Sequence, residues 1–311
     1  MNTVFFFDQI TRYSPYFNLA LEEAIAINLF DFGYSGAIRF WTNHNTIVLG
    51  ISDSVTKNIP EETIVSFKEI FPNLQKKRKF QEDLLYITRR ASGGGTVFHD
   101  EAFNLNYSLF ASTKEKKELY PVKDSYIILL GLVTKALAKQ GIMAGSAGKS
   151  DIAVETGGVL KKISGNAQFR KRDCIVQHGT LILDTKIIDR VIQNLSHPPE
   201  EPDYRKNRKH SDFLTSLPGD FSISQFKQEL LSIFKEFLGT TVISNEGEKS
   251  TSVLKTIDQE NFTINSSKEN RPLPRVEVTV TNRKFLRQVF RDAKRLMSEK
   301  YANIEFIFSK T

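Results

Sequence analysis

Three consecutive glycines separate an arginine pair from a histidine–aspartate pair in the segment ITRRASGGGTVFHD, which begins at Ile87. Glycine loses more backbone freedom on folding than any other residue, so ordering such a run is costly. A bare backbone exposes its N–H groups, which suits an anion or a thin ligand that must lie against the chain. Arginine beside such a run could hold a carboxylate or a phosphate. The segment therefore predicts a ligand-binding loop, with an unliganded glycine-rich hairpin as the alternative.

The loop matches neither of the two common phosphate-binding motifs. A Walker-type loop needs Lys-Ser/Thr directly after its last glycine, whereas Thr96 and Val97 follow here. A dinucleotide fingerprint opens a helix, whereas residues 96–110 have the apolar alternation of a strand. A ligand other than a nucleotide phosphate is therefore favoured for this loop.

Lys162 marks a second candidate site, in the segment KKISGNAQ. Ser164 and Gly165 follow it and give another position where the backbone is bare. An ammonium group that points into a pocket could hold a carboxylate, a phosphate or the oxygens of a mixed anhydride. The alternative is a lysine at a strand end that faces solvent.

Cys174 and His178 stand four residues apart in the apolar run CIVQHGTLIL, so a strand would place them on one face. This spacing would allow a thiol nucleophile with a histidine base. No third group that could orient the base is evident, and a buried core histidine is the simpler interpretation of His178. The sequence therefore offers no persuasive covalent nucleophile.

These candidate residues must be positioned by a mixed set of helices and strands. Helices are predicted after Ser14-Pro15, within residues 59–82, over Asp124–Gln140 and over Ser224–Leu238. Strands are predicted for residues 4–7, 84–90, 96–110 and 175–183, for a hairpin turning at Gly157-Gly158, and for two paired segments that start at Ala37 and Thr46.

The composition changes near the C-terminus. Residues 244–274 are polar, which predicts a linker or long loop between a catalytic domain, residues 1–243, and a small C-terminal α+β appendage, residues 275–311. Within the appendage, RVEVTVTN and IEFIFS are predicted strands around a basic amphipathic helix. The basic face of that helix is either solvated or a docking surface for an acidic partner.

The overall composition is ordinary for a globular protein, with 311 residues, 40% hydrophobic and 25% charged. The N-terminus lacks the basic region of a signal peptide and no apolar run is long enough to span a bilayer, so no membrane association is expected. One cysteine suits a reducing compartment, and a cytoplasmic location is predicted. The net charge of +7 comes from 43 basic and 36 acidic residues without aromatic interleaving, so no nucleic-acid binding is expected.

Five segments together resemble the lipoate–protein ligase A family, within the larger group that holds biotin–protein ligases and octanoyltransferases. They are FNLALEEA, RRASGGGTVFHDEAFNLNYS, KKISGNAQ, QHGTLIL and EEPDYRKNRKHSDFLTSL. The resemblance implies an α/β (α+β mixed) fold with a large mixed β-sheet. It also implies a two-step reaction in which ATP, with Mg²⁺, activates lipoate to lipoyl-AMP. A lysine of an acceptor lipoyl domain then attacks the anhydride.

The resemblance implies roles for individual residues. The acyl-binding loop would consist of Arg90, Ser92, Gly93, Gly94 and Gly95, with His99 next to it and Gly165, Ala167 and His178 in the adjoining wall. Lys162 would contact the acyl carbonyl and the phosphate of lipoyl-adenylate, and is the predicted catalytic residue. Lys149 and Asp151 would lie near the nucleotide, with Asp151 near its metal ion. Because successive strand side chains point to opposite faces, Arg90 rather than Arg89 is expected to face the ligand.

Departures from the family pattern leave alternatives open. The usual Gly-Arg-Asn-Asp is Gly148-Lys149-Ser150-Asp151 here, and the C-terminal residues do not resemble the accessory domain of the long bacterial ligases. Activation of free lipoate would then need an accessory subunit, or the chain would perform only the transfer step. One rival is an octanoyl or lipoyl transferase between carrier proteins that needs no ATP and uses an acyl-cysteine, although Cys174 is at neither position where those transferases carry theirs. The second rival is a non-catalytic lipoyl-binding module. A biotin ligase is less favoured than either of these two.

Overall fold

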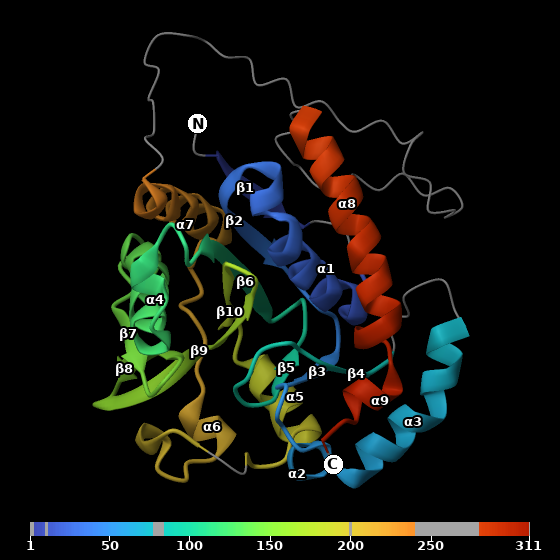
Figure 1. Ribbon diagram of the computed structural model, residues 1–311. Coiled ribbons are helices and arrows are strands. Elements are labelled where there is room, and N and C mark those ends of the chain that lie inside the picture. Colours follow the sequence, from blue (N-terminus) through green and yellow to red (C-terminus); the bar gives the residue numbers. More distant parts are fainter. Residues whose placement is uncertain (1–2, 10–11, 77–83, 199–200, 240–279, 311) are drawn as a thin grey trace.

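The computed structural model describes residues 3–9, 12–76, 84–198, 201–239 and 280–310 (Figure 1). A seven-stranded sheet lies at its centre, in the order β1-β2-β6-β10-β9-β8-β7. Its strands are β1 (Thr3–Asp8), β2 (Tyr34–Trp41), β6 (Asn104–Ser112), β7 (Ala144–Ala147), β8 (Asp151–Thr156), β9 (Val159–Lys171) and β10 (Cys174–Ile182). The β1–β2 pair is parallel and the other neighbours are antiparallel. The predicted large mixed sheet is therefore confirmed.

A second sheet of three strands carries the glycine loop. Its order is β4-β3-β5, formed by β3 (Thr46–Leu49), β4 (Tyr86–Arg89) and β5 (Val97–His99). The predicted pairing of the segments that start at Ala37 and Thr46 is wrong, because β2 pairs with β1 and β6 while β3 pairs with β4 and β5. The strand predicted over residues 96–110 is divided in the same way, with β5 in the small sheet and β6 in the large one.

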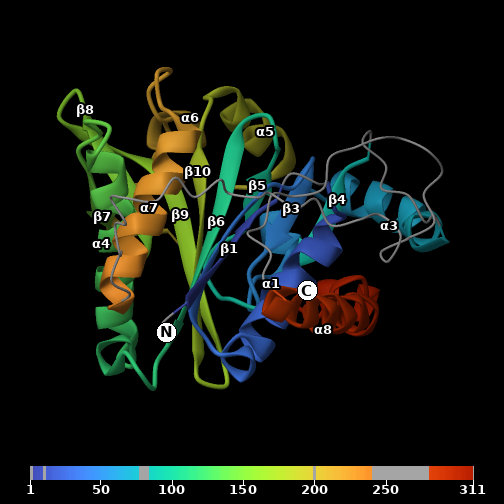
Figure 2. The same cartoon turned by 90° about the horizontal axis from the view of Figure 1, so that it is seen from above.

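The helices pack around both sheets. They are α1 (Pro15–Asn28), α2 (Val55–Asn58), α3 (Glu61–Lys76), α4 (Val122–Ala138), α5 (Lys186–Asn194), α6 (His210–Phe213), α7 (Ile223–Leu238), α8 (Val280–Leu296) and α9 (Ile304–Ile307). Short 3₁₀ turns occupy Phe30–Phe32, Lys117–Leu119 and Asp203–Arg205, and a π-helical turn occupies Met297–Tyr301. Helices α4 and α7 pack together on one face of the large sheet, and α1 and α8 pack together on the other (Figure 2). Within the described residues, no helix is both long and apolar enough to cross a bilayer.

Helix α1 is largely buried, and it brings charged groups into the core. It begins at Pro15, after Ser14, whose hydroxyl accepts a hydrogen bond from the Phe17 amide at 3.2 Å. Nearly all of its residues are buried, including Glu22 at 2% exposed and Glu23 at 1% exposed. A buried carboxylate needs hydrogen bonds or a cationic partner. Both glutamates have such partners. Those of Glu22 lie on the cleft side of the helix, and those of Glu23 include Lys300 and Tyr301 of the C-terminal segment.

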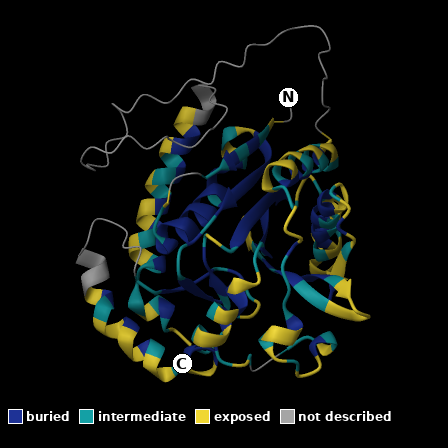
Figure 3. Cartoon of the chain, turned by 180° about the vertical axis from the view of Figure 1, so that it is seen from behind, coloured by how far each residue is buried: buried dark blue, intermediate teal, exposed yellow. Residues whose placement is uncertain are grey.

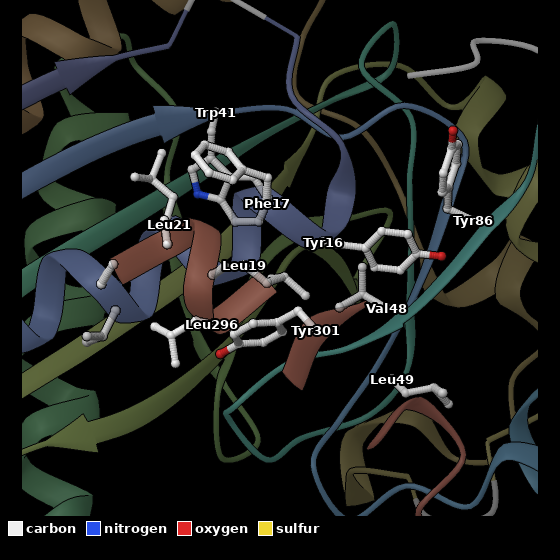
Figure 4. Packing of buried hydrophobic residues seen from close by; sticks show 14 of the residues in the cluster. Tyr16, Phe17, Leu19, Leu21, Trp41, Val48, Leu49, Tyr86, Leu296 and Tyr301 are labelled. Atoms are coloured by element: carbon white, nitrogen blue, oxygen red, sulfur yellow. The ribbon is translucent and has the colours of Figure 1, made fainter. Parts of the chain in front are cut away.

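The C-terminal helices share the core of the molecule. The inner side of α8 is buried and its outer side is exposed (Figure 3). Leu296 and Tyr301 belong to the same apolar cluster as Leu19 and Trp41 (Figure 4). Glu23 accepts hydrogen bonds from the Tyr301 hydroxyl at 2.5 Å and from the Lys300 ammonium at 2.7 Å. Apolar packing and buried polar contacts thus join residues 296–301 to helix α1.

The strand predicted for IEFIFS is wrong, because residues Ile304–Ile307 form helix α9. Asn303 caps it, and its side-chain oxygen accepts a hydrogen bond from the Glu305 amide at 2.8 Å. Of the other predicted strand, residues 275–279 lie outside the described residues and the rest belongs to α8. The predicted linker, residues 244–274, also lies outside them. The division of the chain into a catalytic domain, a linker and an appendage stays a prediction.

Candidate active site

A cleft of about 1040 Å³ opens between the small sheet, the β8–β10 part of the large sheet and residues 196–198 and 201–214. It brings together nearly all residues predicted from the sequence. The predicted residues that line it are Arg90, Gly93, Gly94, Gly95, His99, Lys149, Asp151, Lys162, Gly165, Ala167 and His178. Ser92 does not line it and is only 1% exposed. Two segments about seventy residues apart in sequence, the glycine loop and the Lys162 segment, therefore share one cleft.

Arg90 holds the glycine loop in shape. Its Nη2 donates to the Gly93 carbonyl at 2.6 Å and to the Gly95 carbonyl at 2.8 Å, and its Nε donates to Ser92 Oγ at 2.9 Å. Burial lowers the pKa of the guanidinium to about 10, so it stays charged at neutral pH. Arg90 therefore organises the loop backbone and also lines the cleft, and its contact with a ligand stays a prediction.

Arg89 points away from the loop and binds other parts of the backbone. Its Nη1 donates to the Gly50 carbonyl at 2.5 Å and to the Asp53 carbonyl at 2.9 Å. Its Nε donates to the Ile307 carbonyl at 3.0 Å, which ties α9 to the strand before the loop. The strand alternation that separated the two arginines is thus present in the structure.

The three glycines of the loop differ in whether a residue with a side chain could replace them. Gly94 has φ +82°, a left-handed conformation that is costly for any residue with a side chain. A Cβ added at Gly93 or Gly95 would meet no atom within 4 Å, so the absence of side chains there is not required by packing. Both residues line the cleft. Their bare backbone leaves room for a ligand to lie directly against the loop.

A buried chain of polar groups supports the loop from behind. His178 Nε2 lies 2.7 Å from Ser92 Oγ, and its Nδ1 lies 2.8 Å from Glu22 Oε2. Burial raises the pKa of the Glu22 carboxyl, but His178, Ser108 and Arg39 together lower it more, and the pKa lies below its ordinary value. Ser108 Oγ also donates to Glu22 Oε1 at 2.6 Å. Glu22 is therefore a carboxylate that fixes the ring of His178, and through it Ser92 and Arg90.

Glu22 was missed from the sequence. The available signal was an acidic pair within the otherwise apolar helix FNLALEEAIAINL, since a glutamate on a buried helix needs a partner. No feature of the sequence alone identified His178 as that partner.

His99 is held as a neutral ring in the wall of the cleft. Its Nδ1 lies 3.2 Å from Asn43 Nδ2, and its Nε2 lies 3.0 Å from Thr180 Oγ1. Asn43 Oδ1 already accepts a hydrogen bond from Asn18, so the Asn43 amide group donates to His99 Nδ1 and the ring proton is on Nε2. Burial, Arg90 and His178 lower the pKa of His99 to about 3. It therefore shapes the pocket without adding charge.

Lys162 lies opposite the loop, in an ion pair. Its Nζ is 2.7 Å from Asp151 Oδ1, and the Tyr204 hydroxyl donates to Asp151 Oδ2 at 2.8 Å. A Cβ at Gly165 would lie 2.9 Å from Lys162 Nζ, so glycine is required there if the ammonium is to keep this place. The Thr215 amide donates to the Lys162 carbonyl at 2.9 Å and fixes the strand. Tyr204 was not singled out from the sequence, although it lies in the segment EEPDYRKNRKHSDFLTSL.

Asp151 is the carboxylate that the sequence assigned to a metal ion. Within the described parts of the chain, no group of three or more His, Cys, Asp or Glu side chains is arranged to hold a metal. Both oxygens of Asp151 already have partners. Mg²⁺ is commonly held by one or two carboxylates together with substrate phosphates, and Asp151 fits that kind of shared site.

Cys174 lies away from the cleft. Its side chain is completely buried, and burial raises the pKa of the thiol. Within the described residues, the hydrogen-bond acceptor that its Sγ contacts is the Ile175 carbonyl. A buried, uncharged thiol is a poor nucleophile. His178 is already engaged by Ser92 and Glu22, so the possible Cys174–His178 pair is not formed.

The other walls of the cleft are largely apolar. Its apolar lining includes Leu19, Trp41, Val48, Phe98, Ile182 and Val191. The indole of Trp41 is fixed by a hydrogen bond from its Nε1 to Ser108 Oγ at 2.9 Å. The cleft therefore combines apolar walls suited to an acyl chain with a cationic group suited to its carboxylate end.

Residues 14–235 match the family model of the lipoyl protein ligase A/B catalytic domain. This match covers well over half of the chain. The chain belongs to the lipoyl protein ligase A/B family. The resemblance inferred from the sequence is therefore confirmed.

Solved structures of lipoate–protein ligases share the fold of this family member. A bi-partite lipoate protein ligase described with its E2 lipoyl domain, from Thermoplasma acidophilum, superimposes with a TM-score of 0.64 at 19% identity, covering 100% of this chain and 97% of that one. A lipoate-protein ligase A bound with ATP gives 0.58 at 19% identity, covering 100% and 99%. LipL1 of P. falciparum, in complex with lipoate, gives 0.57 at 15% identity, covering 99% and 74%. At these identities the likeness establishes the fold.

Proposed function

We propose that this chain is an ATP-dependent lipoate–protein ligase. It would activate lipoate to lipoyl-AMP and transfer the lipoyl group to a lysine of an acceptor lipoyl domain. The observation that supports this most directly is the place of Lys162, whose ammonium, paired with Asp151, lines the same cleft as the bare glycine loop. The ATP-bound and lipoate-bound relatives support the choice of substrates.

The first step forms a mixed anhydride. A lipoate carboxylate oxygen attacks the α-phosphorus of ATP, an acyl–phosphate bond forms, and pyrophosphate leaves. Negative charge is concentrated where the carboxylate meets the phosphate, and a fixed ammonium lowers the cost of bringing them together. Lys162 is that ammonium, and its ion pair with Asp151 fixes its position. Mg²⁺, held by Asp151 together with the nucleotide phosphates, would supply further charge neutralisation.

The second step transfers the acyl group. The neutral amine of the acceptor lysine attacks the carbonyl carbon, the nitrogen loses a proton to solvent as the amide forms, and AMP leaves with the electron pair of the broken C–O bond. Lys162 would stabilise the oxyanion that develops on the carbonyl oxygen. The apolar walls and the glycine loop keep water from the anhydride while it waits for the acceptor.

The buried thiol argues against the transferase alternative. An acyl-cysteine intermediate needs a reactive thiol in the cleft, and Cys174 is neither in the cleft nor exposed. The non-catalytic alternative is disfavoured because the Lys162–Asp151 pair is kept in place by Gly165 and Tyr204.

Lipoate-dependent exchange of labelled pyrophosphate into ATP tests the activation step. We expect exchange that requires lipoate and is lost in Lys162→Ala. Absence of exchange, together with transfer from synthetic lipoyl-AMP, would instead indicate that activation needs an accessory subunit, as the bi-partite T. acidophilum relative suggests. Absence of both reactions would contradict the proposal.

A further inference from the structure

The turn between β7 and β8 carries Lys149 and leads directly into Asp151, the two residues expected near the nucleotide. It consists of residues 148–150, and Ala147 pairs with Asp151 across its base. The Asp151 carboxylate in turn positions the Lys162 ammonium. Small displacements of reacting groups cost a large factor in rate. The contacts that fix this turn therefore bear on the chemistry of the cleft.

Asn166, a buried residue of β9, holds one side of this turn. Its side chain is only 7% exposed, and its Nδ2 donates to the Ser150 carbonyl at 2.8 Å. This carbonyl belongs to the peptide bond that joins Ser150 to Asp151. On the other side, a Cβ at Gly148 would lie 3.0 Å from Pro202 Cβ, so the turn packs closely there. The turn is thus held between a hydrogen bond and a packing contact.

The direction of the Asn166 amide is set by its oxygen. The Tyr107 hydroxyl donates to Asn166 Oδ1, and Ser164 Oγ donates to the same oxygen at 3.3 Å. Burial raises the pKa of Tyr107, so its hydroxyl keeps its proton and remains a donor. With Oδ1 facing two donors, Nδ2 must face the carbonyls of Ser150 and Ser164. The hydrogen-bonding capacity of the amide is therefore used within the protein and not for a ligand.

Gly179 leaves room for this arrangement. It lies opposite Tyr107 on one neighbouring strand and opposite Asn166 on the other. A Cβ at Gly179 would overlap Asn166 Oδ1 and would lie 2.6 Å from the Tyr107 hydroxyl oxygen. The bond between Tyr107 and Asn166 therefore requires glycine after His178 in the segment QHGTLIL.

We infer that Asn166 is a positioning residue for adenylation. Oriented by Tyr107, it fixes the Ser150 peptide, and through that peptide Asp151 and Lys162. The inference rests on the proposed function for the reaction that is affected, and Asn166 itself contacts no substrate. What the role requires is a donor at Nδ2, because an acceptor in its place would leave the Ser150 carbonyl without its partner and repel it.

The isosteric variant Asn166→Asp tests this role, because it keeps the acceptor for Tyr107 and loses the donor for Ser150. At about pH 8 we expect adenylation at least about tenfold slower than in the wild type, with the KM for lipoate within about twofold. Burial raises the pKa of the introduced carboxyl above its ordinary value of about 3.9. Once protonated, this carboxyl can donate to Ser150 again. The ratio of variant rate to wild-type rate should therefore rise toward one as the pH is lowered to about 5.5.

Gln168→Glu is the matched control for this test. Gln168 lies two residues along the same strand and on the same face, and its Nε2 donates to Gln177 Oε1 at 2.7 Å. The change likewise replaces an amide donor by a carboxylate, yet the variant should keep the wild-type rate at each pH. A purely structural role of Asn166 would lower the rate by a factor that does not vary with pH, and that result would overturn the inference. So would a wild-type rate in Asn166→Asp at about pH 8.

Competitive labelling of lysines with acetic anhydride, followed by mass spectrometry, tests the same contact without catalysis. We expect the reactivity of Lys162 relative to Lys161 to rise roughly threefold in Asn166→Asp, because the ion pair with Asp151 is weakened. An unchanged ratio would contradict the positioning role. A raised ratio in a protein whose wild type forms no lipoyl-AMP would uphold that role and refute the proposed function.

Tyr107→Phe decides the question if circular dichroism shows that Asn166→Asp is unfolded. This variant keeps the ring and removes only the donor that orients the Asn166 amide, while the weaker bond from Ser164 remains. We expect adenylation to slow at least about threefold and the Lys162 labelling ratio to rise. Wild-type values of both quantities would overturn the inference.

Discussion

Gly165 sets the position of the Lys162 ammonium, and Gly165→Ala is the most specific perturbation of the site. An added Cβ would lie 2.9 Å from Lys162 Nζ and 3.0 Å from its Cε. Real Cβ contacts essentially never come this close, so the lysine end must move away. Its flexible chain can do so without disturbing the backbone, and the 2.7 Å contact with Asp151 is then lost.

The effect on stability should be small and the effect on rate large. The Lys162 and Asp151 side chains are 21% and 10% exposed, and a partly exposed ion pair contributes at most about 1 kcal/mol. Removing one positioned oxyanion donor from an active site costs about 100-fold or more in rate. We therefore expect Gly165→Ala to form lipoyl-AMP at least roughly 100-fold more slowly, while its free energy of unfolding changes by no more than about 1 kcal/mol.

Single-turnover adenylation and urea unfolding measure the two quantities. Gly145→Ala is a matched control, because Gly145 is exposed in the neighbouring region of the sheet and a Cβ there meets no atom within 4 Å. The control should keep the wild-type rate. Wild-type adenylation in Gly165→Ala, or a rate loss accompanied by unfolding of the chain, would refute the reasoning about Lys162.

Three further outcomes follow from the same contacts. Lys162→Ala should abolish both adenylation and transfer. The control Lys161→Ala, which changes the same strand outside the cleft, should keep both activities. Cys174→Ser should leave transfer within about twofold of wild type, because a positioned nucleophile would lose far more; abolished transfer would restore the acyl-cysteine alternative. Burial would raise the pKa of Glu23, but Lys171, Lys300 and Tyr301 lower it to about 2 from its ordinary 4.5. Glu23→Gln should therefore cost up to about 3 kcal/mol of stability at neutral pH. Urea unfolding should show this difference shrinking as pH falls from about 4.5 through about 2, and a constant difference would contradict the assignment.

The site could be predicted from the sequence better than the sheet pairing. The glycine loop was predicted as a ligand site because a run without side chains stands between charged residues, and Lys162 was predicted because it matches a lysine of the family pattern; both line one cleft. The pairing of the segments from Ala37 and Thr46 failed because each strand finds its neighbours far along the chain. β2 pairs with β1 and β6, while β3 pairs with β4 and β5. Local alternation carries no information about such partners.

The C-terminal segment shows a second limit. The run IEFIFS alternates in a way that suits a strand, yet it forms helix α9, and short apolar runs are ambiguous between the two. Its conformation depends on contacts that the sequence does not reveal locally, such as the hydrogen bond from Arg89 Nε to the Ile307 carbonyl. Glu22 was missed for the same reason, since its partners His178 and Ser108 lie more than eighty residues away.

The mass of a lipoyl domain after incubation with this chain, ATP, Mg²⁺ and lipoate tests the central claim most directly. The account predicts that the acceptor gains the mass of one lipoyl group on its lysine, only when ATP is present, and not with Lys162→Ala. A gain without ATP would contradict the account. The account would also be contradicted if this chain left the acceptor unmodified even when synthetic lipoyl-AMP replaced ATP and lipoate. The control is another ligase, which must modify the same acceptor under the same conditions.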